Sequence, residues 1–221
     1  MTPKPKPPRP VFATPALTLY ADRHCVSPYA MSVFVALTEL GLPFALRTLD
    51  LAAGEQAGAG FAARSLTRRV PMLTEDDWAL TESSAITEYL QDTRPGAALY
   101  PHNRRARAQA RQVQAWLRSD LLPIRQERPA EGVFCPGRPP PAPLSAAAQQ
   151  AADKLATAAL HWLSDGREHL FGRWCLADTD LALMIQRLIL AGDAVPGVLR
   201  CYAQRQWLRP SVQAWCTLPR P

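Results

Sequence analysis

The feature that most constrains the fold of this 221-residue chain is a change of pattern near residue 98. Before it, short apolar or alternating runs typical of strands are interspersed with helical segments, whereas only helical segments follow it. We therefore predict an α/β domain with the order β-α-β, β-β-α over residues 16–97, and an all-α domain over residues 98–221. The predicted strands are residues 17–22, 44–51, 70–73 and 78–80, and the predicted helices are residues 28–40, 83–91, 104–128, 145–164, 178–191 and 196–207.

Proline is concentrated in three stretches, residues 3–15, 136–143 and 209–221, and its 22 residues are about twice the average usage. Residues 1–15 have no apolar periodicity, so we predict a flexible arm there. The segment 135–143, CPGRPPPAP, is predicted to be a stiff exposed loop between two helices.

Composition excludes several classes of protein and site. No apolar run reaches the ~18 residues that a membrane span needs, and prolines occupy the place where a signal peptide would have its apolar centre. The five cysteines are an odd number and have no Cys-x-x-Cys spacing, which argues against a disulfide framework and against a zinc site. We expect a cytoplasmic protein with no bound metal and no membrane partner.

The net charge of +6 makes an anionic ligand or a nucleic acid a candidate partner. Arginines recur as one stripe along the predicted helix 104–128, which is either a solvated face or subunit rim, or in part the holder of an anionic substrate. No aromatic residues interleave this stripe, so we expect no nucleic-acid partner. Its members are Arg104, Arg107, Arg111, Arg118 and Arg125.

Three other residues of the helical half have predicted structural effects. Asp120 falls on the apolar side of its helix, so its carboxylate should be paired or face a cavity, and both a salt bridge and a ligand amino group fit. Pro123 predicts a kink one turn away. Asp178 begins an apolar helix and is expected to bond backbone N–H groups, so that Asp178→Ala should cost ~1 kcal/mol or more.

Ser27 precedes Pro28 at a predicted helix start. The pair is common in structural N-caps. The position also puts a hydroxyl and free N–H groups at the positive end of a helix, where a thiolate is stabilised. Lowering a thiol pKa by two units needs ~2.7 kcal/mol. One hydrogen bond to a charged acceptor contributes ~1.5–3 kcal/mol and the helix end ~0.3–1 kcal/mol, which together suffice.

Four local signatures in this order resemble the soluble glutathione S-transferases, which have a thioredoxin-like domain followed by a helical one. They are Ser27-Pro28-Tyr29, Arg68-Arg69-Val70-Pro71, Glu82-Ser83-Ser84-Ala85-Ile86 and Leu176-Ala177-Asp178. The resemblance covers about residues 16–215. The runs WLRSD at 116–120 and ADTDL at 177–181 look like the bacterial YfcF-type branch of that family.

The resemblance implies a role in binding glutathione as co-substrate for the first three signatures, whereas the fourth, which contains Asp178, is expected to be structural. Ser27 would stabilise its thiolate. A cis bond before Pro71 would let the Val70 backbone pair with the tripeptide like an added strand, and Arg69 would meet the glycyl carboxylate. Glu82 and Ser83 would hold the γ-glutamyl ammonium and carboxylate. From the residues alone, two structural alternatives stay open: Arg68 and Arg69 could be a solvated arginine pair, and Ser83 and Ser84 could be ordinary helix caps.

The expected activity is conjugation of glutathione to a small hydrophobic or anionic electrophile held between the domains, with glutathione-dependent peroxide reduction as a variant. We assign Tyr29, Trp116 and Arg118 to the electrophile pocket. Tyr29 is treated as a packing residue and not as the thiol-activating tyrosine of other branches. A homodimer is implied by the resemblance.

Two other classes of function remain open from the sequence. Cys25, two residues before Ser27, could form a mixed disulfide with glutathione, which would make the protein a glutaredoxin-like thiol-disulfide reductase. The turn is similar to the glutaredoxin Cys-Pro-Tyr-Cys motif, but Ser27 and Ala30 stand at its two cysteine positions, which argues against dithiol chemistry. The second alternative is a non-catalytic interaction protein with the same fold.

Overall fold

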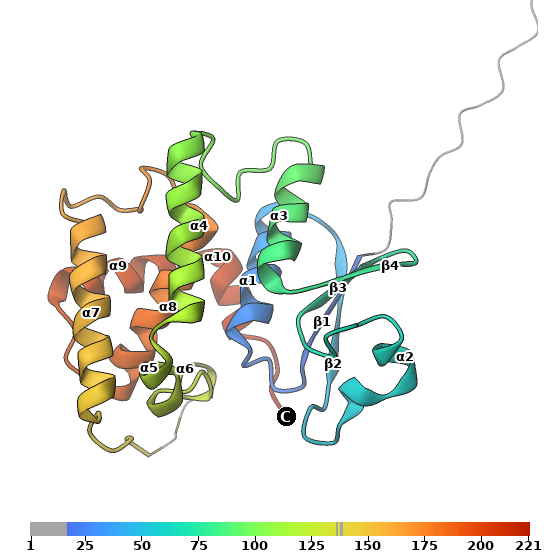
Figure 1. The fold of residues 1–221 in the computed structure, drawn as a ribbon, viewed down its shortest axis with the longest axis horizontal. Coiled ribbons are helices and arrows are strands. Elements are labelled where there is room, and N and C mark those ends of the chain that lie inside the picture. Colours follow the sequence, from blue (N-terminus) through green and yellow to red (C-terminus); the bar gives the residue numbers. More distant parts are fainter. Residues whose placement is uncertain (1–16, 136, 138) are drawn as a thin grey trace, which may run out of the picture.

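A computed structural model describes residues 17–135, 137 and 139–221 of the chain (Figure 1). The predicted arm over residues 1–15, and part of the predicted loop over residues 135–143, lie outside the described residues. The α/β half and the helical half lie side by side in Figure 1, with α1 and α3 on the side of the sheet that faces the helical half.

The N-terminal half contains a mixed four-stranded sheet with the order β2-β1-β3-β4. β1 pairs in parallel with β2 and antiparallel with β3, and β3 pairs antiparallel with β4. The predicted order β-α-β, β-β-α is therefore confirmed. The elements are β1 (Leu17–Asp22), α1 (Pro28–Glu39), β2 (Phe44–Leu49), β3 (Met72–Glu75), β4 (Trp78–Thr81) and α3 (Ser83–Thr93).

The C-terminal half is helical throughout its described residues, as predicted. α8 lies at its centre and packs against α1, α4 and α9, because its residues are apolar around most of the circumference and most of them are buried. The helices are α4 (Arg104–Ser119), α5 (Leu122–Glu127), α6 (Glu131–Phe134), α7 (Ala146–Trp162), α8 (Leu176–Ala191), α9 (Gly197–Trp207) and α10 (Pro210–Cys216). The domain boundary that we predict near residue 98 falls in the connection between α3 and α4.

The sequence did not predict four short elements: η1 (Glu55–Ala57), α2 (Ala59–Ala62), α6 and α10. Each is at most seven residues long. Such segments are too short for a 3.6-residue apolar period to become visible.

The single helix predicted over residues 104–128 is wrong, because the helix is broken and not merely kinked. α4 ends at Ser119, Leu121 has a left-handed backbone with φ of 58°, and α5 starts at Leu122. Pro123 explains the break, since its ring would clash with the carbonyl of Ser119 in a continuous helix.

Asp120 is paired at this break, which agrees with the salt-bridge interpretation of its position. Its carboxylate accepts hydrogen bonds from Lys154, from the Trp116 indole at 2.9 Å and from the Leu121 N–H at 2.9 Å. These hydrogen bonds lower the pKa of Asp120 to about 2, and the bond from Lys154 has the largest effect. The residue therefore joins α4 to α7.

Glu39, at the end of α1, ties the two halves of the chain together. Its carboxylate accepts two hydrogen bonds from Arg209, at 2.7 and 2.6 Å, and one from the Ser211 hydroxyl. Burial raises the pKa of the Glu39 carboxyl, but the bonds from Arg209 and Ser211 outweigh it and leave that pKa below its ordinary value of 4.5.

We expect Glu39→Gln to lower the melting temperature at pH 7 by about 2–8 °C, from the loss of about 1–2 kcal/mol of charge-assisted hydrogen bonding. Since the folded pKa is depressed, this stabilisation is present above pH 4.5 and is lost as pH falls through the folded value. The melting temperatures of the wild type and of Glu39→Gln, measured from pH 7 to pH 3, should therefore converge as the pH falls. The more exposed Glu88, which pairs with Arg111, is the control, and Glu88→Gln should have a smaller effect at pH 7. A difference in melting temperature between the wild type and Glu39→Gln that does not change with pH would contradict this account.

In the part of the chain that the structure describes, no helix is long and apolar enough to cross a membrane.

Candidate functional site

The loop between β1 and α1 is held by Asp22, which the sequence analysis missed. Its carboxylate accepts hydrogen bonds from the N–H groups of Val26 and Ser27, both at 2.9 Å, and its side chain is buried with 6% of the residue exposed. An aspartate at the end of a strand, a few residues before a helix start, was the only available signal. Asp22 fixes the backbone that carries Ser27.

Ser27 caps α1, so its structural interpretation is confirmed. Its hydroxyl oxygen accepts a hydrogen bond from the Ala30 N–H at 3.2 Å, and Pro28 follows in the first turn. This bond uses the oxygen as an acceptor and leaves the hydroxyl hydrogen as a donor. Among the described residues, no hydrogen bond is donated by this hydroxyl. Capping therefore does not exclude a donation to a thiolate.

A cavity of about 500 Å³ opens beside this helix start. It brings together three of the predicted glutathione-site residues, Ser27, Arg69 and Val70. The peptide bond between Val70 and Pro71 is cis, as the resemblance implied. Within the described residues, neither the N–H nor the C=O of Val70 has a backbone partner, so both are available to an extended peptide.

Glu82 and Ser83 do not line this cavity. They lie at the start of α3, where Glu82 is exposed with φ of 70° and Ser83 is buried with 5% exposed. The side chain of Glu82 makes no capping hydrogen bond. The γ-glutamyl roles of these two residues therefore stay predictions.

A narrow recess also adjoins the start of α1. It contains Tyr29 and Arg118, two of the three residues assigned to the electrophile pocket, and it shares Pro28 with the larger cavity. The Arg118 guanidinium lies 6.0 Å from the centre of the Tyr29 ring and donates to Asp180 at 3.3 Å.

Trp116, the third residue of that assignment, does not line the recess. Its ring packs edge-on against Trp162 of α7 at 5.5 Å, and its indole donates to Asp120. The side chain therefore serves the contact between α4 and α7, and we remove it from the proposed pocket.

The predicted arginine stripe does not act as one surface. Arg111 pairs with Glu88 of α3, whereas Arg118 and Arg125 line the recess beside Tyr29. Sequence analysis missed Arg187 of α8, which completes the recess from the opposite helix. An arginine inside an otherwise apolar helical run was its only signal.

Cys25 is poorly placed for thiol chemistry. Its residue is buried with 3% exposed, and burial raises the pKa of its thiol above the ordinary value. A thiol that stays protonated is a weak nucleophile. The geometry therefore favours packing over a mixed disulfide.

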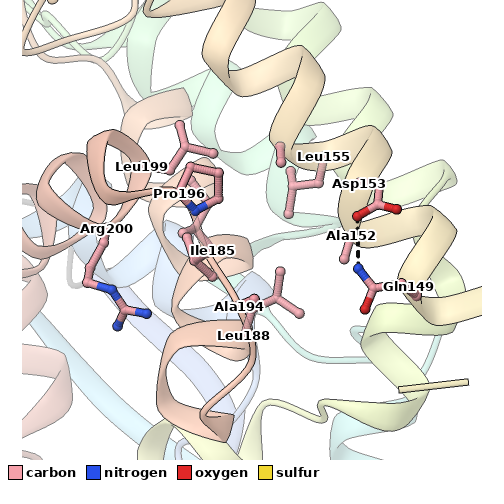
Figure 2. Close-up of a pocket in the computed structure, with 12 residues that line it drawn as sticks. Gln149, Ala152, Asp153, Leu155, Ile185, Leu188, Ala194, Pro196, Leu199 and Arg200 are labelled. Carbon is pink, nitrogen blue, oxygen red and sulfur yellow. Dashed lines mark hydrogen bonds between the residues drawn. The ribbon is translucent and has the colours of Figure 1, made fainter. Parts of the chain in front are cut away.

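A further hollow of about 510 Å³ lies between α7, α8 and the start of α9 (Figure 2). Its lining is mainly apolar, and its two polar residues on α7, Gln149 and Asp153, bond to each other at 2.8 Å. It contains none of the predicted site residues. The described residues also contain no cluster of histidine, cysteine and carboxylate side chains that could hold a metal ion.

Comparison with protein-family models gives two matches. The model of the glutathione S-transferase N-terminal domain matches residues 26–93, and that of the C-terminal domain matches residues 103–220. The curated relatives include glutathione S-transferase theta-2 from Rattus norvegicus, 35% identical over 101 residues. That alignment covers 45% of this chain and 41% of the relative, so the match spans less than half of the relative's length.

Among solved structures, a glutathione transferase homolog from Burkholderia gl BGR1, crystallised with bound glutathione, is 45% identical. The match covers 90% of this chain and 95% of that one, with a TM-score of 0.72. A theta class enzyme from Xanthomonas axonopodis pv. citri, with glutathione bound, has a TM-score of 0.73 at 24% identity and covers 93% and 99% of the two chains. This second likeness concerns the fold.

Proposed function

This chain belongs to the glutathione S-transferase family, and from that premise we propose that it conjugates glutathione to small electrophiles. The observation that carries the proposal is that Ser27, Arg69 and Val70 line one cavity at the N-terminus of α1. This cavity combines a hydroxyl donor, a cation and an unpaired peptide group, which suit a thiolate, a carboxylate and a peptide backbone respectively.

In the proposed mechanism, the chain holds glutathione in an extended conformation along the Val70 backbone, with Arg69 at the glycyl carboxylate. The thiol loses its proton to solvent. The resulting thiolate accepts a hydrogen bond from Ser27 at the positive end of α1. Its sulfur then attacks the electrophilic carbon and forms a C–S bond, and the leaving group departs with the electron pair of the broken bond.

We expect Arg69→Met to raise the KM for glutathione about tenfold or more, with a smaller change in kcat, because it removes a charged contact to a part of the peptide remote from the sulfur. Its neighbour Arg68, which does not line the cavity, is the matched control. Steady-state kinetics of Arg68→Met should resemble those of the wild type. An equal rise in KM for both variants would contradict the assignment of Arg69.

The conjugation itself is tested by incubating the protein with glutathione and 1-chloro-2,4-dinitrobenzene. The expected products are the dinitrophenyl conjugate, identified by mass spectrometry, and one chloride ion per conjugate. Product formation no faster than in a protein-free control, across several aryl and alkyl halides, would overturn the proposal.

We further propose a homodimer in the cytoplasm. The family resemblance supports the dimer, and the five free cysteines suit a reducing compartment. Sedimentation equilibrium should give twice the chain mass of 24.3 kDa, and a concentration-independent single-chain mass would contradict the dimer.

A further inference from the structure

Arg187 is a buried cation that has no acidic partner among the described residues. Only 5% of the residue is exposed. Its guanidinium donates one hydrogen bond, to the carbonyl of Arg128 at 2.7 Å, and its Nε has no partner among the described residues. Burial lowers the pKa of this group to about 10. A buried charge with unfilled hydrogen bonds is costly unless something compensates it.

The recess beside Tyr29, which Arg187 lines, contains more positive than negative groups. Arg118 and Arg125 line the same recess, whose one acidic residue, Asp180, is engaged by Arg118 at 3.3 Å and by Gln114 at 2.7 Å. Both hydrogen bonds of the Arg125 guanidinium go to carbonyls, of Leu117 and Asp120.

The other titratable groups that act on Arg187 are Tyr29 and Glu131. Glu131 is not among the residues that line the recess and forms no salt bridge within the described part of the chain. The recess itself therefore has three arginines and one already paired carboxylate.

The recess is also small and close to the proposed sulfur position. Its interior volume is about 30 Å³, room for a single small polar group and not for a whole substrate. Pro28 lines both this recess and the cavity that contains Ser27. A group bound beside Arg187 would thus anchor a molecule whose remainder extends toward the start of α1.

We propose that this recess binds a carboxylate on the electrophile, so that the preferred substrates are anionic aryl or acyl compounds. The inference rests on the proposed conjugation activity, whose electrophile it narrows to one chemical class. Arg187 supplies the buried cation. Arg118 lies on the facing helix and can move from Asp180 to the incoming carboxylate.

A binding experiment without glutathione tests the recess independently of catalysis. The probes are 3,5-dinitrobenzoate, which has no leaving group, and its neutral methyl ester, compared by thermal shift at constant ionic strength in sodium chloride. We expect a saturable rise in melting temperature with the carboxylate but not with the ester. The rise should disappear in Arg187→Met and persist in Arg111→Met, whose arginine pairs with Glu88 outside the recess. Equal responses to both probes, or an unchanged response in Arg187→Met, would overturn the proposal.

Kinetics with 4-chloro-3,5-dinitrobenzoate and its methyl ester then test the substrate class. We expect the wild type to prefer the carboxylate, and Arg187→Met to lose about tenfold or more in kcat/KM for the carboxylate but less than twofold for the ester. Arg118→Met should give the same selective loss from a different helix, so the test does not depend on one buried substitution. Equal losses for both substrates would contradict the anionic subsite. Failure of the wild type to conjugate even the ester would instead count against the proposed function.

Discussion

Ser27→Ala is expected to lower kcat/KM for conjugation about 10- to 100-fold at pH 7. The variant loses one hydrogen bond to a charged acceptor, ~1.5–3 kcal/mol, and each 1.4 kcal/mol is a factor of ten. The helix end stays in place, so part of the thiolate stabilisation should remain. Because the variant is impaired only in ionising the glutathione thiol, its activity should rise with pH until it approaches that of the wild type. Rate profiles from pH 6 to pH 9 check this.

The matched control for Ser27→Ala is Ser145→Ala. Ser145 caps α7 as Ser27 caps α1, with the Ala148 N–H at the same 3.2 Å from its hydroxyl oxygen. Ser27→Ala should lose about 1 kcal/mol of stability, and Ser145→Ala, whose hydroxyl also donates to Glu127, at least as much, but only Ser27→Ala should lose activity. Equal activity in the two variants, or a loss in Ser27→Ala that does not change with pH, would show that Ser27 is only a cap.

Asp178→Ala should be the most destabilising of the substitutions considered, by about 3–5 kcal/mol. The buried carboxylate accepts hydrogen bonds from the N–H groups of Leu170 and Cys175, at 2.8 and 2.9 Å, and from the Tyr202 hydroxyl at 2.7 Å. The substitution leaves all three donors buried without a partner. The expected fall in melting temperature is about 6–20 °C, well above the ~1 kcal/mol that loss of a simple cap would cost.

Two companion variants separate the Asp178 network from a general effect of losing a charge. Tyr202→Phe removes one of the three bonds and should cost about 1–2 kcal/mol. Asp153→Ala removes a carboxylate on the exposed side of α7, whose one hydrogen-bond partner in the described part of the chain is Gln149, and should change stability by less than ~0.5 kcal/mol. Melting curves check all three, and a fall for Asp178→Ala no larger than that for Tyr202→Phe would contradict the account.

The element order of this fold was predictable from the sequence because each strand and long helix has its own local pattern. The strand over residues 17–22 and the helix from Pro28 were predicted to within about a residue, since apolar runs, proline and Gly41 mark their ends. The break at Leu121 was not predicted. A left-handed leucine has no sequence signal, and Pro123 alone fits a kink as well as a complete break.

Site residues that belong to a local sequence signature could be predicted, whereas those whose position depends on the packing of distant helices could not. Ser27, Arg69 and Val70 share a cavity because β1 and β3 are antiparallel neighbours, so that the C-terminal end of β1 lies beside the start of β3. The signatures that follow β1 and precede β3 were recognisable in the sequence. Arg187 was not predicted, because its position opposite Tyr29 depends on how α8 packs against α1. Trp116 does not share the recess with Tyr29 and Arg118, and the sequence could not predict this, since helix periodicity gives a face but not the neighbour that covers it.

The most direct test of the central claim is a thermal-shift titration of the protein with glutathione, with Ser83→Ala beside the wild type. At a hundred times the dissociation constant, binding stabilises the folded state by ~2.7 kcal/mol, which corresponds to a rise of about 5–10 °C. Ser84→Ala, which alters the exposed neighbour of Ser83, is the control. The account predicts a saturable rise that is weakened in Ser83→Ala and retained in Ser84→Ala. A flat response of the wild type at millimolar glutathione would contradict it.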